Sequence, residues 1–293
     1  MSETQQDEYA SLLMHYPDID RNRQSIHDCL QRTCTPTFIC DRTILQDRYR
    51  RLADSLASHW GPSVIGYSFK TNYLVARSRI FQDLGGWAEV VSAREYALAR
   101  SLGVDGKQII FNGPHKPEES LKTAISDGAM INVNDPDELD RLIALAAVRE
   151  DTVDIGIRLG MTLPKLGHSR FGFSLESGEA LQAIEAIRNS SNLRLVGLHT
   201  HLHGDTDDPN IYRMAATRVA EFAVQYLPDH GRDLRYLNLG GGYPAHSLKP
   251  KSRLEWNPQP IDIYIQGIAD GLKMAFGDQQ QLPTLVVEPG RYL

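Results

Sequence analysis

The feature that most constrains the fold of this chain is a regular alternation between short apolar runs and longer stretches with helical periodicity. The runs are rich in β-branched residues and nearly continuous in their apolar character, which is typical of strands buried on both faces. Eight runs fit this description: Ser63–Phe69, Trp87–Val91, Gln108–Phe111, Met130–Val133, Val153–Leu159, Leu193–His201, Tyr236–Leu239 and Thr284–Val287.

The stretches between these runs predict amphipathic helices. One is expected from about Thr43 to His59, and another begins after Asp135, which is followed by Pro136. An aspartate can accept hydrogen bonds from the first free N–H groups of a helix, and proline is tolerated in the first turn. Buried strands that alternate with helices predict a parallel sheet covered by helices. Eight such units favour an α/β fold of the (β/α)8 TIM-like barrel type over an open sheet.

Composition narrows the classes of partner and compartment. The formal net charge of −6 gives no basic excess of the kind that attracts nucleic acid. No apolar run approaches the roughly 18 residues of a membrane-spanning helix, and the polar N-terminus does not resemble a secretory signal. The three cysteines form neither a disulfide framework nor a CxxC metal pattern. We therefore expect a cytoplasmic protein that binds neither nucleic acid nor membrane.

The domain organisation predicted from these patterns has two parts. Residues 1–34 form a polar extension that is partly helical, with an amphipathic segment around Leu12 that is either an exposed arm or a partner-binding helix. Residues 35–293 form the barrel. Within it, the proline-rich segment 244–260 is expected to be a surface loop.

A barrel makes a specific demand on the position of functional residues, because catalytic groups follow the carboxyl ends of its strands. Polar residues and glycines do gather at these points of the sequence. They are Lys70, Glu89, Ser92, Gly113, Arg158, His201, the glycines 240–242 and Glu288. Charges scattered over a surface would not fall so consistently at one end.

Two adjacent segments predict an anion site. Gly240, Gly241 and Gly242 follow the seventh strand, where glycines allow a tight turn and can direct N–H groups at an anion. Arg291 follows the eighth strand, which neighbours the seventh in a closed barrel. Phosphate sites after strands seven and eight recur in barrels, although three glycines can also form a simple turn.

Lys70 ends the first strand and admits two interpretations. A partly desolvated lysine at the end of an apolar strand favours the neutral amine and becomes a candidate nucleophile. Alternatively, its ammonium group extends out of the barrel mouth into solvent.

The alternating histidines His199, His201 and His203 place three imidazoles on one side of a strand. With Asp205 and Asp207 they suggest a metal site, but such sites need further ligands from other strands. Packing of a histidine ring on a flat cofactor is the interpretation we favour, and no metal is predicted.

Seven segments together resemble a known family. YSFKTN, EVVSARE, FNGPHK, SRFGF, GLHTHLHGD, NLGGGYP and EPGRYL resemble the fold-type III pyridoxal-phosphate decarboxylases, in the family's order from about Thr35 to the last residue. That group includes ornithine, diaminopimelate and arginine decarboxylases. The resemblance implies a barrel of the alanine racemase/ornithine decarboxylase type with pyridoxal 5′-phosphate as cofactor.

The resemblance also implies roles for individual residues. Lys70 matches the lysine that carries the cofactor as a Schiff base, His201 the imidazole that stacks on its ring, and Glu288 the carboxylate that pairs with its pyridine nitrogen. These three are the implied catalytic residues. The implied phosphate site is formed by Gly240, Gly241, Gly242 and Arg291, and further polar positions around the cofactor are Glu89, Glu95, Arg158 and Arg170.

The implied activity is decarboxylation of a basic amino acid or of diaminopimelate, in a homodimer or with a complementary chain. A pyridoxal-phosphate-binding or partner-binding barrel without turnover, and an amino-acid racemase, are the alternatives. Two departures from the family pattern bear on this choice. After His201 the chain reads Leu-His-Gly-Asp, without the usual serine that reaches the phosphate. The chain also ends at Leu293, where family members continue into a β domain, so a truncated chain, a split enzyme and a barrel-only protein all remain open.

Overall fold

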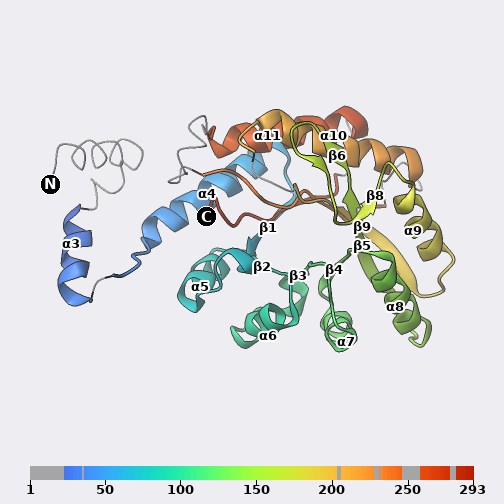
Figure 1. Ribbon diagram of the computed structural model, residues 1–293, viewed down its shortest axis with the longest axis horizontal. Helices are drawn as coiled ribbons and strands as arrows, with labels where there is room; N and C mark the ends of the chain where they lie inside the picture. Colours follow the sequence, from blue (N-terminus) through green and yellow to red (C-terminus); the bar gives the residue numbers. More distant parts are fainter. Residues whose placement is uncertain are drawn as a thin grey trace.

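Eight parallel strands close into a barrel at the centre of the molecule (Figure 1). The computed structural model describes residues 23–34, 36–202, 206–227, 231, 233–245, 258–277 and 282–293. The sheet closes because β1 pairs with both β2 and β11, and β4 pairs with both β3 and β5. All eight predicted strands belong to it, which confirms the (β/α)8 fold. Their bounds are β1 Ser63–Ser68, β2 Trp87–Val90, β3 Ile109–Phe111, β4 Met130–Val133, β5 Val153–Gly160, β9 Leu193–His199, β10 Tyr236–Asn238 and β11 Thr284–Val287.

Helices cover the outside of the barrel, one in each connection between consecutive barrel strands (Figure 1). A further helix, α4 (Arg42–His59), precedes β1 and packs against both α5 and α11, so it covers the barrel where the last strand meets the first. The helices in the connections are α5 Val75–Asp83, α6 Ala93–Ser101, α7 Glu118–Asp127, α8 Pro136–Ala147, α9 Glu179–Arg188, α10 Pro209–Tyr226 and α11 Ile261–Phe276.

The helix starts follow the capping residues in the sequence. Asp41 accepts hydrogen bonds from the N–H groups of Thr43 and Ile44 at the start of α4. Asp135 Oδ1 accepts from the N–H of Glu138, 2.9 Å away, and Pro136 occupies the first turn of α8. The helix predicted after Asp135 is therefore confirmed with its cap.

The barrel interior is divided into an apolar level and a polar level. Ile110, Val196, Tyr236 and Val286 form a small core of their own, separate from the large core between strands and helices. The interior becomes polar two residues further toward the carboxyl ends of β3, β4, β10 and β11. The buried side chains at that level include Asn112, Asn132, Asn238 and Glu288. Because side chains alternate between the two faces of a strand, the same strands supply both levels.

Two glycines allow Tyr236 to cross the barrel. Its hydroxyl donates to Asn132 Oδ1 at 2.8 Å, although β10 and β4 are not neighbouring strands. A Cβ atom at Gly197 would lie 2.1 Å from the Tyr236 ring, and one at Gly156 would lie 2.2 Å from its hydroxyl. Only glycine at both positions leaves room for the tyrosine side chain.

Some elements differ from the sequence-based expectation. The chain adds an antiparallel pair, β6 (Thr162–Leu163) with β7 (Gly167–His168), and then β8 (Phe173–Ser174) beside the end of β5. Strands of two residues are too short to show periodicity. Short 3-10 helices, η1 (Phe69–Thr71) and η2 (Gly106–Gln108), flank β1 and β3.

The predicted division at residue 35 stays a prediction. Helix α3 (Arg23–Arg32) has no buried residue and lies away from the barrel (Figure 1). Three features discussed from the sequence lie outside the described residues. They are the segment around Leu12, residues 246–257 of the predicted loop, and His203. Among the helices that the structure describes, none has the length and apolar character to cross a bilayer.

Candidate active site

A cavity of about 460 Å³ opens at the carboxyl ends of the barrel strands. This is the end at which a (β/α)8 barrel places its functional groups. The cavity brings together residues at or just after the ends of β1, β2, β3, β5, β9, β10 and β11. The predicted site residues that line it are Lys70, Glu89, Arg158, Arg170, His201, Gly242, Glu288 and Arg291.

Two buried glutamates form the floor of the cavity, and one asparagine joins them. The Asn112 Nδ2 amide donates to Glu288 Oε1 at 2.6 Å and to Glu89 Oε1 at 3.1 Å. Asn238 Nδ2 also donates to Glu288 Oε1 at 2.6 Å, and Ser68 Oγ donates to Glu89 Oε2 at 2.5 Å. Both carboxyl groups are therefore held in fixed orientations.

The two glutamates differ in their affinity for a proton. Burial raises the pKa of Glu89 to about 7, with the nearby Lys70 opposing and the negative Glu288 reinforcing the shift. Burial also opposes ionisation of Glu288, but His199, His201 and Lys70 together hold the pKa of Glu288 below its usual value. Two buried carboxylates that share a donor repel each other. Near neutral pH the negative charge therefore resides on Glu288, while Glu89 is still partly protonated.

Two histidines face Glu288 from the end of β9, as the alternation of the sequence predicts. His199 Nε2 lies 3.7 Å from Glu288 Oε2, and His201 Nδ1 lies 3.9 Å from it, both too far for hydrogen bonds. The Gly241 N–H donates to His201 Nδ1 at 3.1 Å, which assigns the hydrogen of the neutral ring to Nε2. Burial is the main reason that the pKa of His199 is lowered and that of His201 lies well below its usual value. Burial therefore makes both rings weaker bases than a free imidazole in water.

Several buried polar atoms at the cavity have no partner within the described part of the chain. They are Glu288 Oε2, Arg158 Nε and both ring nitrogens of His199. Leaving a buried polar group unsatisfied costs about 1–3 kcal/mol. A group of such atoms around one cavity indicates that the site is built to receive a ligand with polar groups of its own.

The rim of the cavity is cationic. Lys70, Arg170 and Arg291 are exposed there, and the Arg158 and Arg170 guanidinium groups lie 4.9 and 5.3 Å from the centre of the Phe171 ring. Of the two interpretations of Lys70, the exposed side chain agrees with the one in which the lysine extends toward solvent, because β1 ends at Ser68 and the lysine follows in η1. An acidic floor below a cationic rim suits a ligand with an anionic group at one end and a protonated nitrogen at the other.

The glycine loop after β10 is shaped by close contacts. Gly240 and Gly242 have positive φ angles of 65° and 86°, and a Cβ at Gly241 would lie 1.9 Å from the Glu288 carbonyl oxygen. The Gly240 N–H donates to Asn238 Oδ1, and the Gly241 N–H to His201 Nδ1. Of the three glycines only Gly242 lines the cavity, so the predicted phosphate contact narrows to that residue and Arg291.

Three asparagines of the site were missed by sequence reasoning. Asn112, Asn132 and Asn238 each stand two residues after a large apolar residue inside a strand, and that repeated spacing is the signal that would have found them. Glu95, which the family resemblance places near the cofactor, instead accepts from the Val91 N–H at 2.8 Å beside the start of α6. It does not line the cavity.

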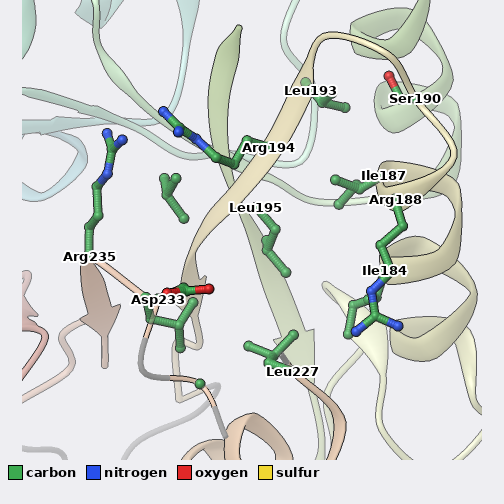
Figure 2. A pocket seen from close by; sticks show the side chains of 13 residues that line it. Ile184, Ile187, Arg188, Ser190, Leu193, Arg194, Leu195, Leu227, Asp233 and Arg235 are labelled. Carbon is green, nitrogen blue, oxygen red and sulfur yellow. The ribbon is translucent and has the colours of Figure 1, made fainter. Parts of the chain in front are cut away.

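A second cavity lies at the opposite ends of the strands. It measures about 520 Å³ and is bounded by the beginning of β9 at Leu193, with arginines around it (Figure 2). Arg194 and Arg235 pair with Asp154, and Arg188 donates to the Tyr226 carbonyl. No predicted site residue lines this cavity. Among the residues that the structure describes, no cluster of three or more metal-ligating side chains occurs.

Comparisons with known proteins found a matching family and similar relatives. Residues 43–293 match a family described as pyridoxal-dependent decarboxylase, pyridoxal binding domain. The diaminopimelate decarboxylases of Halalkalibacterium halodurans and Methanocaldococcus jannaschii are 26% and 27% identical to the chain, and the alignments cover 88% of this chain in both cases. The chain spans 60% and 61% of the lengths of these relatives.

The chain also resembles solved structures of decarboxylases in its fold. The crystal structure of the M. jannaschii diaminopimelate decarboxylase superposes with a TM-score of 0.78 at 25% identity, over 91% of this chain and 63% of that one. The lysine/ornithine decarboxylase of Vibrio vulnificus, complexed with putrescine, superposes with a TM-score of 0.71 at 23% identity, over 92% of this chain and 67% of that one. The second likeness concerns the fold alone.

Proposed function

The chain belongs to the pyridoxal-dependent decarboxylases through their pyridoxal-binding domain, and from this premise we propose that it binds pyridoxal 5′-phosphate at the barrel mouth for amino-acid decarboxylation. The observation that carries the proposal is the pairing of an acidic floor with a cationic rim around one cavity. The unpaired Glu288 Oε2 on that floor suits a protonated ring nitrogen, and the rim suits a phosphate.

Individual residues of the chain fit this cofactor. We assign covalent attachment to the Lys70 amine, contact with the ring nitrogen to Glu288, and packing on the flat face of the ring to His201. The phosphate is assigned to Gly242 and Arg291. Each of these residues lines the same cavity, and the relatives that the chain resembles are diaminopimelate decarboxylases.

The bound cofactor supplies an electron sink for the electron pair left when a carboxylate departs as CO2. The chain supplies the environment. Glu288, kept ionised, accepts a hydrogen bond at Oε2 and so keeps a proton on the atom that faces it. The His201 ring limits the access of water to the floor of the cavity. Lys70, exposed at the mouth, can carry a proton between the cavity and solvent.

The proposed substrate is an α-amino acid of the basic or diaminopimelate type. Diaminopimelate decarboxylases are the relatives that support this class, and Arg158 and Arg170 add positive charge for a carboxylate. The partnership predicted from the sequence, a homodimer or a complementary chain, and the cytoplasmic location stay predictions. Sedimentation analysis of the purified protein tests the first of them.

A covalent labelling experiment tests the cofactor assignment. The chain is mixed with pyridoxal phosphate, reduced with borohydride and digested, and the labelled peptide is identified by mass spectrometry. The expected label lies on Lys70, and Lys70→Ala abolishes both label and visible absorbance. Lys122→Ala, which removes a half-exposed lysine on α7, is the matched control and keeps both. Absence of any label from the wild-type chain would contradict the assignment.

CO2 release tests the reaction separately. The loaded protein is assayed with diaminopimelate, lysine, ornithine and arginine, and release from one of them is expected. A labelled protein that releases no CO2 but interconverts the enantiomers of an amino acid would be a racemase. A labelled protein inactive in both assays would be a cofactor-binding domain without turnover.

A further inference from the structure

A continuous chain of hydrogen bonds runs across the barrel interior and ends on the two glutamates of the floor. The Tyr236 hydroxyl donates to Asn132 Oδ1 at 2.8 Å, and Asn132 Nδ2 donates to Asn112 Oδ1 at 2.8 Å. Asn112 Nδ2 then donates to Glu288 and Glu89. The exposed fractions of Tyr236, Asn132 and Asn112 are 5%, 1% and 4%, so water does not compete for these bonds.

The direction of this chain is fixed at its carboxylate end. An ionised carboxylate only accepts, so Asn112 must turn its amide hydrogens toward Glu288 and its oxygen toward Asn132. Asn132 must then donate to Asn112 and present its own oxygen to Tyr236. A tyrosine hydroxyl can act as donor or acceptor, and here it is required to donate. Tyr236 therefore holds the Asn132 amide in one of its two possible orientations, and Asn132 does the same for the Asn112 amide.

The geometry also brings two buried carboxyl groups to a single donor. The two hydrogens of one Asn112 amide reach one oxygen of Glu288 and one of Glu89, and both carboxyl groups are almost completely buried. Other groups act on this pair from several elements. They are Ser68 and Lys70 after β1, Arg158 on β5, His199 and His201 at the end of β9, and Asn238 on β10.

We propose that Asn112, oriented by Asn132 and Tyr236, is a positioning residue that stabilises the ionised form of both carboxyl groups, more strongly for Glu288 than for Glu89. It acts by giving both carboxyl groups a shared donor of fixed direction, with the shorter bond to Glu288. The inference rests on the proposed function, because it explains how the carboxylate assigned to the cofactor nitrogen keeps its charge beside a second buried acid. It extends that function to residues that the sequence did not single out.

The direct test follows the proton of Glu89 by infrared spectroscopy on the chain without cofactor. A protonated carboxyl group has a carbonyl stretch separate from that of a carboxylate. The band is assigned by its loss in Glu89→Gln and is titrated with pH. In the wild type it should fade around neutral pH, in line with the raised pKa of about 7 for Glu89.

Asn112→Leu removes the shared donor but keeps the branched shape and the number of heavy atoms of the side chain. Because a hydrogen bond from Asn112 favours the ionised form of Glu89, its loss should move the midpoint upward, by about one pH unit or more. A residue with a merely structural role would lower thermal stability without moving this midpoint. A wild-type midpoint in a folded Asn112→Leu protein overturns the proposal.

If Asn112→Leu does not fold, Tyr236→Phe tests the proposal instead. This variant should fold because its ring still fills the space beside Gly197. It leaves Asn132 Oδ1 without its donor, so a smaller upward shift is expected, and no shift would then count against the relay. Tyr96→Phe, which removes a hydroxyl bonded to Asp127 on the outside of the barrel, is the control and should titrate as wild type. Because no cofactor is added, failure of cofactor binding and failure of this inference give different results.

Discussion

Glu288 is the residue on which the most independent contacts converge. Asn112 and Asn238 both donate to its Oε1 atom, each at 2.6 Å, which leaves Oε2 directed toward the histidines and without a partner among the described residues. A carboxylate held in this way has one oxygen committed to the protein and one available to a ligand. Its side chain is 1% exposed, so the available oxygen is also desolvated.

Replacing this charge without changing its shape is the sharpest test at the residue scale. Glu288→Gln should weaken pyridoxal phosphate binding by at least about tenfold, because a charge-assisted hydrogen bond in a desolvated site is lost. Spectroscopic titration of the cofactor measures the effect, and the thermal midpoint of the variant controls for folding. Glu95→Gln, at a position outside the cavity, should bind as wild type. Equal affinity of Glu288→Gln and wild type would remove Glu288 from the cofactor site.

Sequence reasoning found those site residues whose side chains are chemically unusual at the end of an apolar strand. A lysine, a histidine and a glutamate at strand ends were conspicuous, and Lys70, His201 and Glu288 do line one cavity. Asn112, Asn132 and Asn238 were not conspicuous, because asparagine near a strand end usually indicates a turn. Their function depends on which strands face each other across the barrel, and that is decided only by closure of the sheet.

At the scale of elements, the glycine loop couples β10 to β11 through backbone contact. The Glu288 N–H donates to the Gly240 carbonyl at 2.7 Å, and the Glu288 carbonyl lies where a Gly241 side chain would begin. The loop therefore fixes where the glutamate enters the cavity. Gly240 and Gly241 allow this close approach, and the N–H groups of both donate within the protein.

Gly241→Ala should be destabilising for this reason. The added Cβ would lie 1.9 Å from the Glu288 carbonyl oxygen, so the two strand ends must separate, at a cost of about 1–3 kcal/mol in the free energy of unfolding. Urea denaturation measures this change. Gly267→Ala in α11 is the control, because a Cβ there meets its nearest neighbour at 3.4 Å and alanine favours the helix. Comparable stability of both variants would contradict the close contact.

A buried ion pair joins the loop after β3 to the start of α8. Lys116 Nζ donates to both Glu138 carboxylate oxygens, at 2.8 and 3.0 Å, and to the carbonyls of Gly113 and Asn132. Both side chains are at most 1% exposed. Gly113 lines the cavity, so this pair holds part of the cavity wall.

Lys116→Met should therefore lower the free energy of unfolding by about 3–5 kcal/mol, because it leaves the Glu138 carboxylate buried without a counter-charge. Adding Glu138→Gln to the same chain should recover part of the loss, since no unpaired buried charge remains. Denaturation of the single and double variants measures both effects. A double variant that is less stable than the single one would show that the carboxylate has another source of stabilisation.

The elements themselves were largely predictable. Eight apolar runs and the helices between them determine the barrel, because a strand buried on both faces has few alternatives. The pieces β6, β7 and β8 were not predictable, since two residues carry no period. The predicted end of the sixth run at His201 was two residues too late, because β9 ends at His199 and the chain turns toward the cavity there.

At the scale of the whole molecule, the barrel combines an apolar level that supports stability with a polar level that carries chemistry. Tyr236 belongs to both, with its ring in the interior core and its hydroxyl in the polar relay. Because the polar level is buried, its titratable groups lose contact with water when the chain folds. The pH dependence of global stability should therefore report on the site.

Glu89 gives this effect a definite sign. Its pKa is raised to about 7 in the folded protein and returns to its ordinary value near 4.5 on unfolding, so the folded state binds the extra proton between these values. Stability from this group is complete at low pH and is lost as pH rises through that window, by up to about 3 kcal/mol. Urea denaturation at about pH 5 and about pH 8 should show that loss in the wild type and a smaller one in Glu89→Gln. Glu185→Gln, at an exposed position of α9, should keep the wild-type difference. Equal pH dependence of wild type and Glu89→Gln would place the proton elsewhere, because a glutamine cannot titrate and any remaining change must come from other groups.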